Sequence, residues 1–330
     1  MAVRLGVSFD GFSPLPDAVA IAKAAVEAGA ASLWMAEHLG YRDSLTSCMA
    51  YALATPRATV VPTAVSPYLR NPMPLAMALA TLAEAAPGRA NIAIGVGNPL
   101  FLEESGVTID KPVRVIREYV EMLRSLWSGE PVRQDGMLYR LAGARMMFKP
   151  SVPIPIYLAP MKEQMLRLAG RIADGVVLSA GLSPEFARHS LSIAAAGAVE
   201  KGRDPASLRK AAYIYFLASD DTKRVRETLR QKLAFLMRNR FLDDNIGHSG
   251  IKIDQEAIIA AVAKRDMEAA AKLVPDEAID RFAVGGTPRQ CHDGLERYIE
   301  AGIEEPVLLM AGLPEDREAA FAVIREFNAA

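Results

Sequence analysis

The segment Pro87–Pro99, PGRANIAIGVGNP, carries the strongest fold signal in the sequence. Its residues 90–94 form a short, almost entirely apolar run, typical of a parallel strand buried on both faces. The run continues into GVGN at 95–98, where glycine permits positive φ and lets a backbone approach a ligand closely. Because α/β folds bind ligands beyond the carboxyl ends of such strands, the segment predicts a ligand site there. The alternative to a ligand site is a simple Gly-rich turn between a strand and a helix. The segment is not a dinucleotide-binding fingerprint, because no third glycine follows and no helix is expected to start at once.

Composition and charge describe a soluble globular protein. The 330 residues include 38 Lys+Arg and 39 Asp+Glu, so the net charge of −1 gives no signature of nucleic-acid or anionic-membrane binding. Apolar runs stop short of the ~18 residues that a membrane span needs, and residues 1–11 lack the apolar region of a signal peptide. The two cysteines and four histidines show no metal-ligand spacing. We therefore expect a cytoplasmic protein with reduced thiols and no metal, nucleic-acid or membrane partner.

Short apolar strands alternate with amphipathic helices, which predicts βα units and a parallel sheet. The expected strands are 3–9, 32–36, 58–64, 90–94, 156–159, 175–179, 212–218 and 306–311. The expected helices include 16–28, 75–86, 113–127, 162–172, 184–201, 222–242, 288–301 and 314–327. This pattern predicts an α/β (β/α)8 TIM barrel as one domain over residues 1–330, with an open doubly wound sheet as the alternative.

Two segments are longer than ordinary connections and are expected to be rim insertions. Residues 128–155 contain a hairpin-like GEPVRQDGMLYRL, and residues 243–283 contain helical patterns at 255–263, 267–273 and 276–282. Insertions of this kind usually cover or shape a site. Just before the second insertion lies a basic patch, for which an anion site and a solvated charged face both remain open: Arg226, Arg230, Arg238 and Arg240.

Polar side chains follow the second and third expected strands. Glu37 and His38 come directly after strand 32–36, where barrel enzymes gather their polar groups. Imidazole titrates near neutrality and can exchange a proton or hydrogen-bond a redox ring, although a lone strand-end histidine is often a simple hydrogen-bonding group. Arg70 lies in the proline-framed SPYLRNP after the third strand and can pair with a phosphate or a carboxylate.

Taken together, an ordered series of motifs resembles the bacterial luciferase-like superfamily of flavin- and deazaflavin-dependent enzymes. The motifs, which run almost the full length, are SLWMAEH, VSPYLRNP, APGRANIAIGVGN, KPVRVIREYVEMLRSLWSGEPV, IPIYLAP, IADGVVLS and VGGTP. Within the superfamily the nearest likeness is to methylenetetrahydromethanopterin reductase-like proteins. The KPVRVIREYVEMLR helix and the helical insertion before AVGGTP are the reasons.

The resemblance implies a (β/α)8 barrel with an isoalloxazine or deazaflavin ring at its C-terminal mouth. It implies that a bulged third strand, often with a non-prolyl cis peptide, supports the ring from behind. The glycines of the GxG make room for the cofactor. Helix N-termini bind the phosphate of the cofactor. The cofactor-binding residues implied are Thr63, Ala64, Val65, Gly95, Gly97, Asn98, Ala159, Met161, Lys162, Ser179, Ala180 and Gly181. As catalytic residues it implies His38, in contact with ring or substrate, and Glu37, which alternatively only holds neighbouring backbone.

One departure from the reductases changes the expected substrate. Those enzymes carry acidic residues near the end of the first strand and directly after the GxG, where this chain has Ser8 and Asn98. Neither side chain can replace a carboxylate as acid or base, so methanopterin is in doubt while the cofactor pocket stays intact.

Three functions remain open from the sequence. The first is hydride transfer to or from a small-molecule substrate with 8-hydroxy-5-deazaflavin (coenzyme F420). The second, favoured by Glu37-His38, is an FMN-dependent monooxygenase served by a separate flavin reductase. The third is a flavin-binding protein that has lost its chemistry. We also expect a homodimer or a homotetramer.

Overall fold

The computed structural model describes residues 3–329, so residues 1, 2 and 330, including the start of the N-terminal segment 1–11, lie outside it. The chain divides into two compact units. The first comprises Met1–Val7, Leu178–Ser192 and Lys210–Ala330, and the second comprises Ser8–Val177 and Ile193–Arg209. Each unit is described by itself, and the expectation of a single domain stays a prediction.

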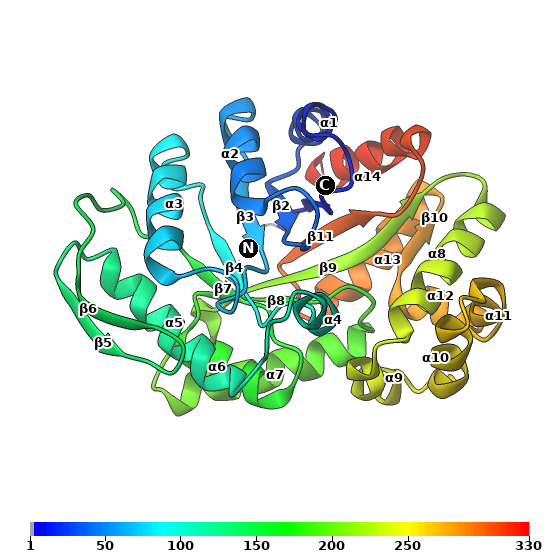
Figure 1. The fold of residues 1–330 in the computed structure, drawn as a ribbon. Coiled ribbons are helices and arrows are strands. Elements are labelled where there is room, and N and C mark those ends of the chain that lie inside the picture. The colour runs from blue at the N-terminus through cyan, green and yellow to red at the C-terminus, as the bar shows by residue number, and fades with distance from the viewer. Residues whose placement is uncertain (1–2, 330) are drawn as a thin grey trace. The chain divides into compact units, whose positions relative to one another are not determined.

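The second unit is built on short, buried parallel strands. They are β2 (Ser32–Ala36), β3 (Thr59–Thr63), β4 (Ile92–Ile94), β7 (Ile156–Leu158) and β8 (Gly175–Leu178). β2 pairs with β3, β4 with β7, and β7 with β8, all in parallel, while isolated bridges such as Val60–Ala90 join β3 to β4. Its helices are α1 (Leu15–Glu27), α2 (Ser44–Ala54), α3 (Pro72–Ala85), α4 (Pro99–Glu104), α5 (Pro112–Leu126) and α6 (Glu163–Ile172). In Figure 1, α2 and α3 lie side by side next to β2 and β3.

Local chemistry explains where several of these elements differ from the expected ranges. α3 begins at Pro72 and not at residue 75, because the Asn71 side chain accepts a hydrogen bond from the Met73 amide and Pro72 suits the first turn. A short helix, α4, starts at Pro99 directly after the GxG, so the expectation of no helix there is wrong. The strands expected at 3–9 and 90–94 shorten to β1 (Gly6–Phe9) and β4.

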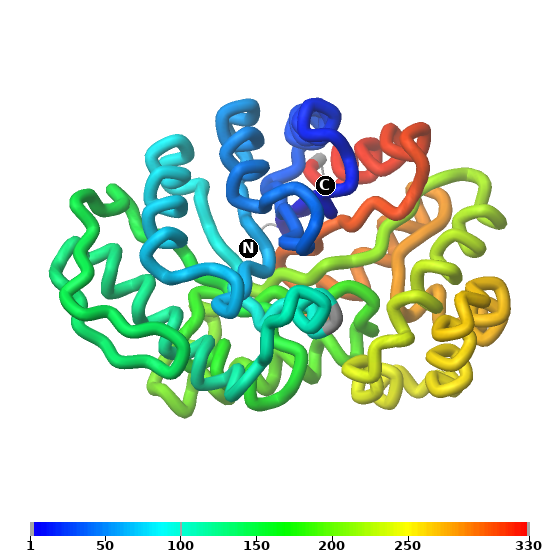
Figure 2. The backbone as a smooth tube through the Cα atoms, viewed as in Figure 1, coloured from blue at the N-terminus to red at the C-terminus, as the bar shows by residue number. Residues whose placement is uncertain are grey.

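The hairpin expected within 128–155 is present. β5 (Val132–Asp135) and β6 (Arg140–Ala144) pair antiparallel, with a register shift at Val132/Arg133. Glu118 of α5 accepts a hydrogen bond from the Met137 amide in the turn at 2.7 Å, which ties the hairpin to that helix. Figure 2 shows the two strands as a green loop beside α5.

The first unit continues the parallel pattern. β11 (Glu305–Met310) pairs with β1 and with β9 (Arg209–Ala218), and β10 (Val284–Gly286) pairs with the end of β9. Its α-helices are α7 (Pro184–Glu200), which continues into the second unit, α8 (Thr222–Met237), α9 (Asp243–Ser249), α10 (Gln255–Ala263), α11 (Met267–Lys272), α12 (Asp276–Phe282), α13 (Pro288–Glu300) and α14 (Arg317–Ala329). Three 3-10 turns complete the elements at Pro205–Ser207, in the second unit, and at Arg240–Leu242 and Pro314–Asp316. In Figure 1, α10–α12 gather against α8.

The basic patch near the second insertion is charge-compensated inside the chain. Arg226 pairs with Asp280 at 2.8 Å, and Arg230 pairs with Asp276. Arg240 pairs with Glu256, and the Arg238 guanidinium lies 3.8 Å from the centre of the Phe235 ring. Of the two alternatives, these contacts favour the charged surface over the anion site, since these cations join the insertion to α8 or cover its surface. Across residues 3–329, none of the helices combines the length and apolarity needed to cross a membrane.

Two glycines bring helix backbones into direct contact in the second unit. A Cβ added at Gly170 in α6 would lie 1.8 Å from the carbonyl oxygen of Ala194 in α7. A Cβ at Gly197 in α7 would lie 2.2 Å from the carbonyl oxygen of Arg167. Because both obstacles are backbone atoms, neither position accepts a side chain unless a helix moves.

We expect Gly170→Ala to lower the free energy of unfolding by about 3 kcal/mol, since overpacking against a rigid backbone is costly. Gly247→Ala in α9 is the matched control, because nothing lies within 4 Å of its added Cβ and its φ is ordinary. That change should be neutral or stabilising by up to ~1 kcal/mol. Urea unfolding measures both, and equal stabilities would contradict the close helix contact.

Candidate functional site

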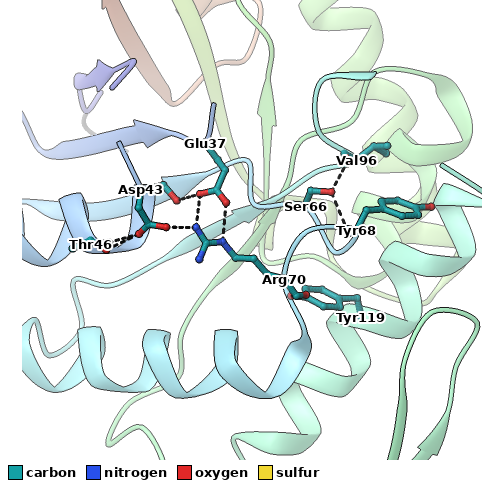
Figure 3. A network of polar contacts seen from close by, with 9 residues as sticks. Glu37, Asp43, Thr46, Ser66, Tyr68, Arg70, Val96 and Tyr119 are labelled. Atoms are coloured by element: carbon teal, nitrogen blue, oxygen red, sulfur yellow. Dashed lines mark hydrogen bonds and ion pairs between the residues drawn. The ribbon is translucent and has the colours of Figure 1, made fainter. Parts of the chain in front are cut away.

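The candidate site lies in the second unit, where β2, β3 and β4 end. Figure 3 shows its central network, in which Arg70 from the loop after β3 meets Glu37 from the loop after β2. Arg70 Nε lies 2.7 Å from Glu37 Oε1, and Arg70 Nη2 lies 3.1 Å from Glu37 Oε2. The Ser44 hydroxyl also donates to Glu37, and Arg70 donates to Asp43 as well. One guanidinium thus joins two carboxylates and two loops.

The charged forms of Arg70 and Asp43 are favoured by their partners in this network. Burial acts against the charge of Arg70, but the hydrogen bonds that it donates to Glu37 and Asp43, and the charges of these carboxylates, raise its pKa. Burial also acts against the charge of Asp43, while hydrogen bonds from Arg70 and Thr46 lower its pKa overall. Both oxygens of Glu37, whose side chain is 8% exposed, are bonded within the chain. The partners of this carboxylate are the side chains of Arg70 and Ser44 and not neighbouring backbone, so the roles expected for Glu37 stay predictions.

Three tyrosine hydroxyls tie the loop after β3 to other parts of the chain. Tyr119 of α5 donates to the carbonyl of Arg70 at 2.8 Å, and Tyr139 of the hairpin donates to the carbonyl of Pro67 at 2.7 Å. Tyr68, in the loop itself, donates to the carbonyl of Asp110 at 2.6 Å. Burial raises the pKa of all three phenols.

The end of β3 has the form that the resemblance implies. The Thr63–Ala64 peptide bond is cis although residue 64 is not proline. The Thr63 carbonyl accepts a hydrogen bond from the Glu37 amide at 2.6 Å. The Val65 amide donates to the Ala93 carbonyl at 2.8 Å, so pairing with β4 resumes after Ala64. The structure therefore brings Thr63, Ala64 and Val65 between the ends of β2 and β4.

The glycines of the GxG have packing roles of their own. A Cβ added at Gly95 would lie 2.9 Å from the Cβ of Ala64 and 3.3 Å from that of Ala159, so atoms of the chain fill that space. Gly97 has φ +97°, a region that glycine favours, and the neighbouring Val96 carbonyl accepts a hydrogen bond from the Ser66 hydroxyl at 2.6 Å. The missing side chain of Gly95 thus lets the strand ends pack closely, which brings Ala64, Gly95 and Ala159 together.

His38 is half-buried and lies among aromatic rings. The ring centres of Phe12, Tyr41 and Phe101 lie 6.2, 6.3 and 6.1 Å from the imidazole centre. Burial lowers the pKa of His38 from 6.5, against the opposing effects of the Asp10 and Glu37 charges. At neutral pH the imidazole is therefore uncharged, with one nitrogen able to donate a hydrogen bond and the other able to accept one.

Sequence reasoning missed Asp10 and the three rings around His38. Asp10 directly follows β1, and its carboxylate accepts a hydrogen bond from the Phe12 amide at 2.9 Å. Ser8, by contrast, is buried within the strand. An acidic residue therefore does follow the first strand directly, although Ser8 itself is not acidic. The same strand-end rule that found Glu37 and His38 also finds Asp10 in VSFDG. The rings come from the loop after β1, the loop after β2 and helix α4, and they leave no local signal.

The two segments expected near the phosphate fall into different units. In the second unit, Ala159 donates from its amide to the Ile94 carbonyl at 2.9 Å, and Met161 and Lys162 lead directly into α6. In the first unit, Ser179, Ala180 and Gly181 lie between β8 and α7. Asn98, at the end of the GxG, is exposed and precedes α4.

Within residues 3–329, a cluster on α13 places possible metal-ligand atoms of His292, Asp293 and Glu296 within 4.8 Å of one another. The two carboxylates are exposed and His292 is half-buried. Exposed acidic groups are common without a metal, so this geometry does not by itself define a metal centre.

The comparison with known protein families decides the family. A family model described as luciferase-like monooxygenase matches residues 4–305. The chain belongs to the luciferase-like family. It is similar to 5,10-methylenetetrahydromethanopterin reductase of Archaeoglobus fulgidus, with 30% identity over 298 residues and 88% of each chain covered. It is also 30% identical over 282 residues to the F420-dependent glucose-6-phosphate dehydrogenase of Nocardia farcinica, covering 83% of this chain and 79% of that one.

Structural comparison gives the fold class. The coenzyme F420-dependent tetrahydromethanopterin reductase of Methanopyrus kandleri matches with a TM-score of 0.89 and 25% identity, covering 99% of this chain and 98% of the other. The luciferase-like chain has the (β/α)8 barrel fold, which confirms the predicted class. Its relatives are F420-dependent oxidoreductases and FMN-dependent monooxygenases, and the protein is an oxidoreductase of this family.

We expect Arg70→Met to destabilise the protein by about 3 kcal/mol near neutral pH, because it leaves the Glu37 carboxylate without its cation. Arg70 also helps to lower the pKa of Asp43. The stability that this pair contributes is fully present above pH 3.8, the pKa of Asp43 in the unfolded chain, and is lost as the pH falls through the lower pKa of Asp43 in the folded protein. The difference from wild type should therefore shrink below about pH 4.

Urea unfolding across that pH range measures the difference. Arg57→Met is the control, because Arg57 is exposed and joins no such network. A deficit of the Arg70 variant that stays constant down to about pH 3 would contradict the role of the carboxylates.

Proposed function

We propose that this chain is a coenzyme F420-dependent oxidoreductase that transfers hydride to or from a small-molecule substrate beside His38. The observation that carries the proposal is the uncharged, half-buried imidazole surrounded by Phe12, Tyr41 and Phe101 at the carboxyl end of β2. Flat apolar surfaces next to a neutral donor suit a planar redox ring. The similarity to F420-dependent relatives supports the same cofactor.

The residues of the second unit fit such a ring. The bulge at Thr63–Val65 and the closely packed Gly95, with Gly97 and Asn98 after it, offer backbone and little side-chain bulk. Ala159, Met161 and Lys162 precede α6, whose N-terminus suits a phosphate. The bound deazaflavin supplies two-electron hydride chemistry. The part of His38 is to donate a hydrogen bond from a ring nitrogen to an oxygen or nitrogen that gains charge as hydride moves.

The substrate class follows from the proton chemistry available. His38 and Asp10 can serve the oxidation of an alcohol or the reduction of a C=N or C=C bond, each of which combines hydride transfer with one proton. Asn98 cannot act as the acid expected after the GxG, so methanopterin is not the proposed substrate. The second candidate function, an FMN-dependent monooxygenase with a separate flavin reductase, is favoured by the Glu37-His38 pair.

A homodimer in the cytoplasm is part of the proposal. α2 contains no charged residue, α3 contains only Glu84, and the two helices lie side by side. Leu53 and Met77 on these helices are 72% and 49% exposed. Such an uncharged face suits burial against a second copy of the chain. A mass measurement in solution tests this, with a homotetramer as the other outcome. Cys48 and Cys291 are free and buried, as in proteins of a reducing compartment.

Titration with oxidised coenzyme F420 and with FMN tests the cofactor. We expect micromolar F420 binding and much weaker FMN binding. The reverse order, together with oxygen consumption that depends on reduced FMN, would favour the monooxygenase. Tight binding of either cofactor without turnover under any donor would instead favour the inactive flavin-binding alternative.

His38→Ala should lower turnover by about 10²-fold, the usual size for a positioned proton-transfer group. For oxidation of an alcohol, in which His38 takes the substrate proton, turnover of the wild type should fall as the pH drops through the His38 pKa, which burial lowers, because the protonated ring can no longer accept. The pH dependence of kcat and urea unfolding check both points, with His292→Ala in α13 as the control. Unchanged turnover in the His38 variant would assign this residue a structural role.

A further inference from the structure

The second unit contains a large cavity at the amino ends of β7 and β8. Its volume is about 940 Å³, and small-molecule sites span roughly 300–1,000 Å³. Its walls come from the C-terminal halves of α5 and α6, which lie side by side (Figure 1), from residues 149–154 before β7 and from residues 201–203 after α7. Because β7 pairs in parallel with β4, this cavity lies at the opposite edge of the sheet from the candidate site.

Basic side chains dominate the charged lining of this cavity. Two of them are paired with carboxylates, since Arg124 Nη2 lies 2.9 Å from Asp174 Oδ2 and Arg171 Nη2 lies 2.6 Å from Glu200 Oε2. Five cations line the cavity together with only two carboxylates, Glu121 and Asp174; the cations are Arg124, Lys149, Arg171, Lys201 and Arg203. The lining therefore has an excess of positive charge, which favours an anionic ligand.

Three of these cations have no carboxylate partner within residues 3–329. Arg203 donates to the carbonyls of Gly170 and Ala173, both at 2.7 Å, so its guanidinium is fixed by the backbone at the end of α6. A guanidinium has several further N–H donors that can bind a ligand. Lys149 and Lys201 are exposed and form no hydrogen bond or ion pair with the described residues. One fixed and two mobile cations are thus available for an anion.

Apolar side chains form another part of the wall. Trp127 is half-buried, and its Nε1 donates to the Ala76 carbonyl at 3.1 Å, which fixes the indole. Val152 lies between two prolines of the lining and is 36% exposed. A fixed aromatic side chain next to cations suits a ligand that carries a planar ring as well as anionic groups.

We propose that this cavity is a second ligand site, which binds a nucleoside polyphosphate. Arg203, Lys149 and Lys201 bind the phosphate groups, and Trp127 with the neighbouring apolar side chains packs against the base. Glu121, which is exposed and has no cation partner in the described chain, accepts hydrogen bonds from the ribose hydroxyls. Every residue of the site belongs to the second unit. The proposal does not depend on the proposed function.

Titration of the full chain with ATP, adenosine and inorganic triphosphate, without a flavin or a divalent metal, tests the ligand class. We expect ATP to bind with a Kd of about 100 μM or lower, and the other two ligands about 10-fold or more weakly, because each keeps only part of the contacts. Acrylamide quenching of tryptophan fluorescence should fall when ATP binds. Trp34, the other tryptophan of the chain, is fully buried, so this change reports on Trp127.

A double variant, Lys149→Gln with Lys201→Gln, tests the location of the site. It removes two cations without breaking a bond of the described chain, and ATP should bind it about 10-fold more weakly than wild type. The matched control is Lys23→Gln with Lys232→Gln, which changes the net charge equally at two exposed lysines outside the cavity lining. The control should bind ATP within about 2-fold of wild type, with a small loss from long-range attraction only.

Four results would overturn the inference. ATP does not bind wild type at millimolar concentration, or it binds both double variants equally weakly, which would show attraction by net charge alone. The Lys149 and Lys201 variant keeps the affinity of wild type, which would place the ligand elsewhere. Inorganic triphosphate binds as tightly as ATP, which would exclude a nucleoside site. The titrations with coenzyme F420 and FMN decide the proposed function separately.

Discussion

The ion pair between Arg70 and Glu37 is the constraint on which the candidate site depends. Arg70 follows β3 and Glu37 follows β2, and the Glu37 amide also bonds the Thr63 carbonyl at the end of β3. A bidentate guanidinium–carboxylate contact fixes orientation as well as distance, which a single-point contact does not. Because His38 follows Glu37 directly, the backbone that carries the imidazole is held from the neighbouring strand. The loops of the site are therefore held in place by the Arg70–Glu37 ion pair, which joins the ends of the buried strands β2 and β3.

Local sequence signals predicted most of the fold. The helical patterns at 255–263 and 276–282 match α10 and α12 residue for residue, since Asp254 caps the first and Pro275 precedes the second. β10 was missed because a three-residue strand with two glycines has almost no strand signal of its own. Its existence depends on pairing with β9, which is a tertiary contact.

The site was less predictable than the fold for a physical reason. His38 and Glu37 follow a strong strand and were found from that position. The partners that determine their chemistry, such as Phe12, Phe101 and Arg70, come from elements far along the chain. The GxG was expected to make room for a cofactor. At Gly95 the structure shows instead that the space is filled by Ala64 and Ala159. A strand-end rule locates a site, but only packing shows what fills it.

The three tyrosine hydroxyls that hold the loop after β3 make the site tolerant of alkaline pH. Each phenol donates its proton to a backbone carbonyl, so each bond lasts while the phenol remains protonated. Because burial raises their pKa values, alkaline solution leaves these bonds intact well beyond the range in which a free tyrosine ionises. Asp43 extends the tolerance in the other direction, because its hydrogen bonds from Arg70 and Thr46 lower its pKa and keep its charge below the range in which a free aspartate protonates. The loop is therefore held by the phenols on the alkaline side and by Asp43 on the acid side.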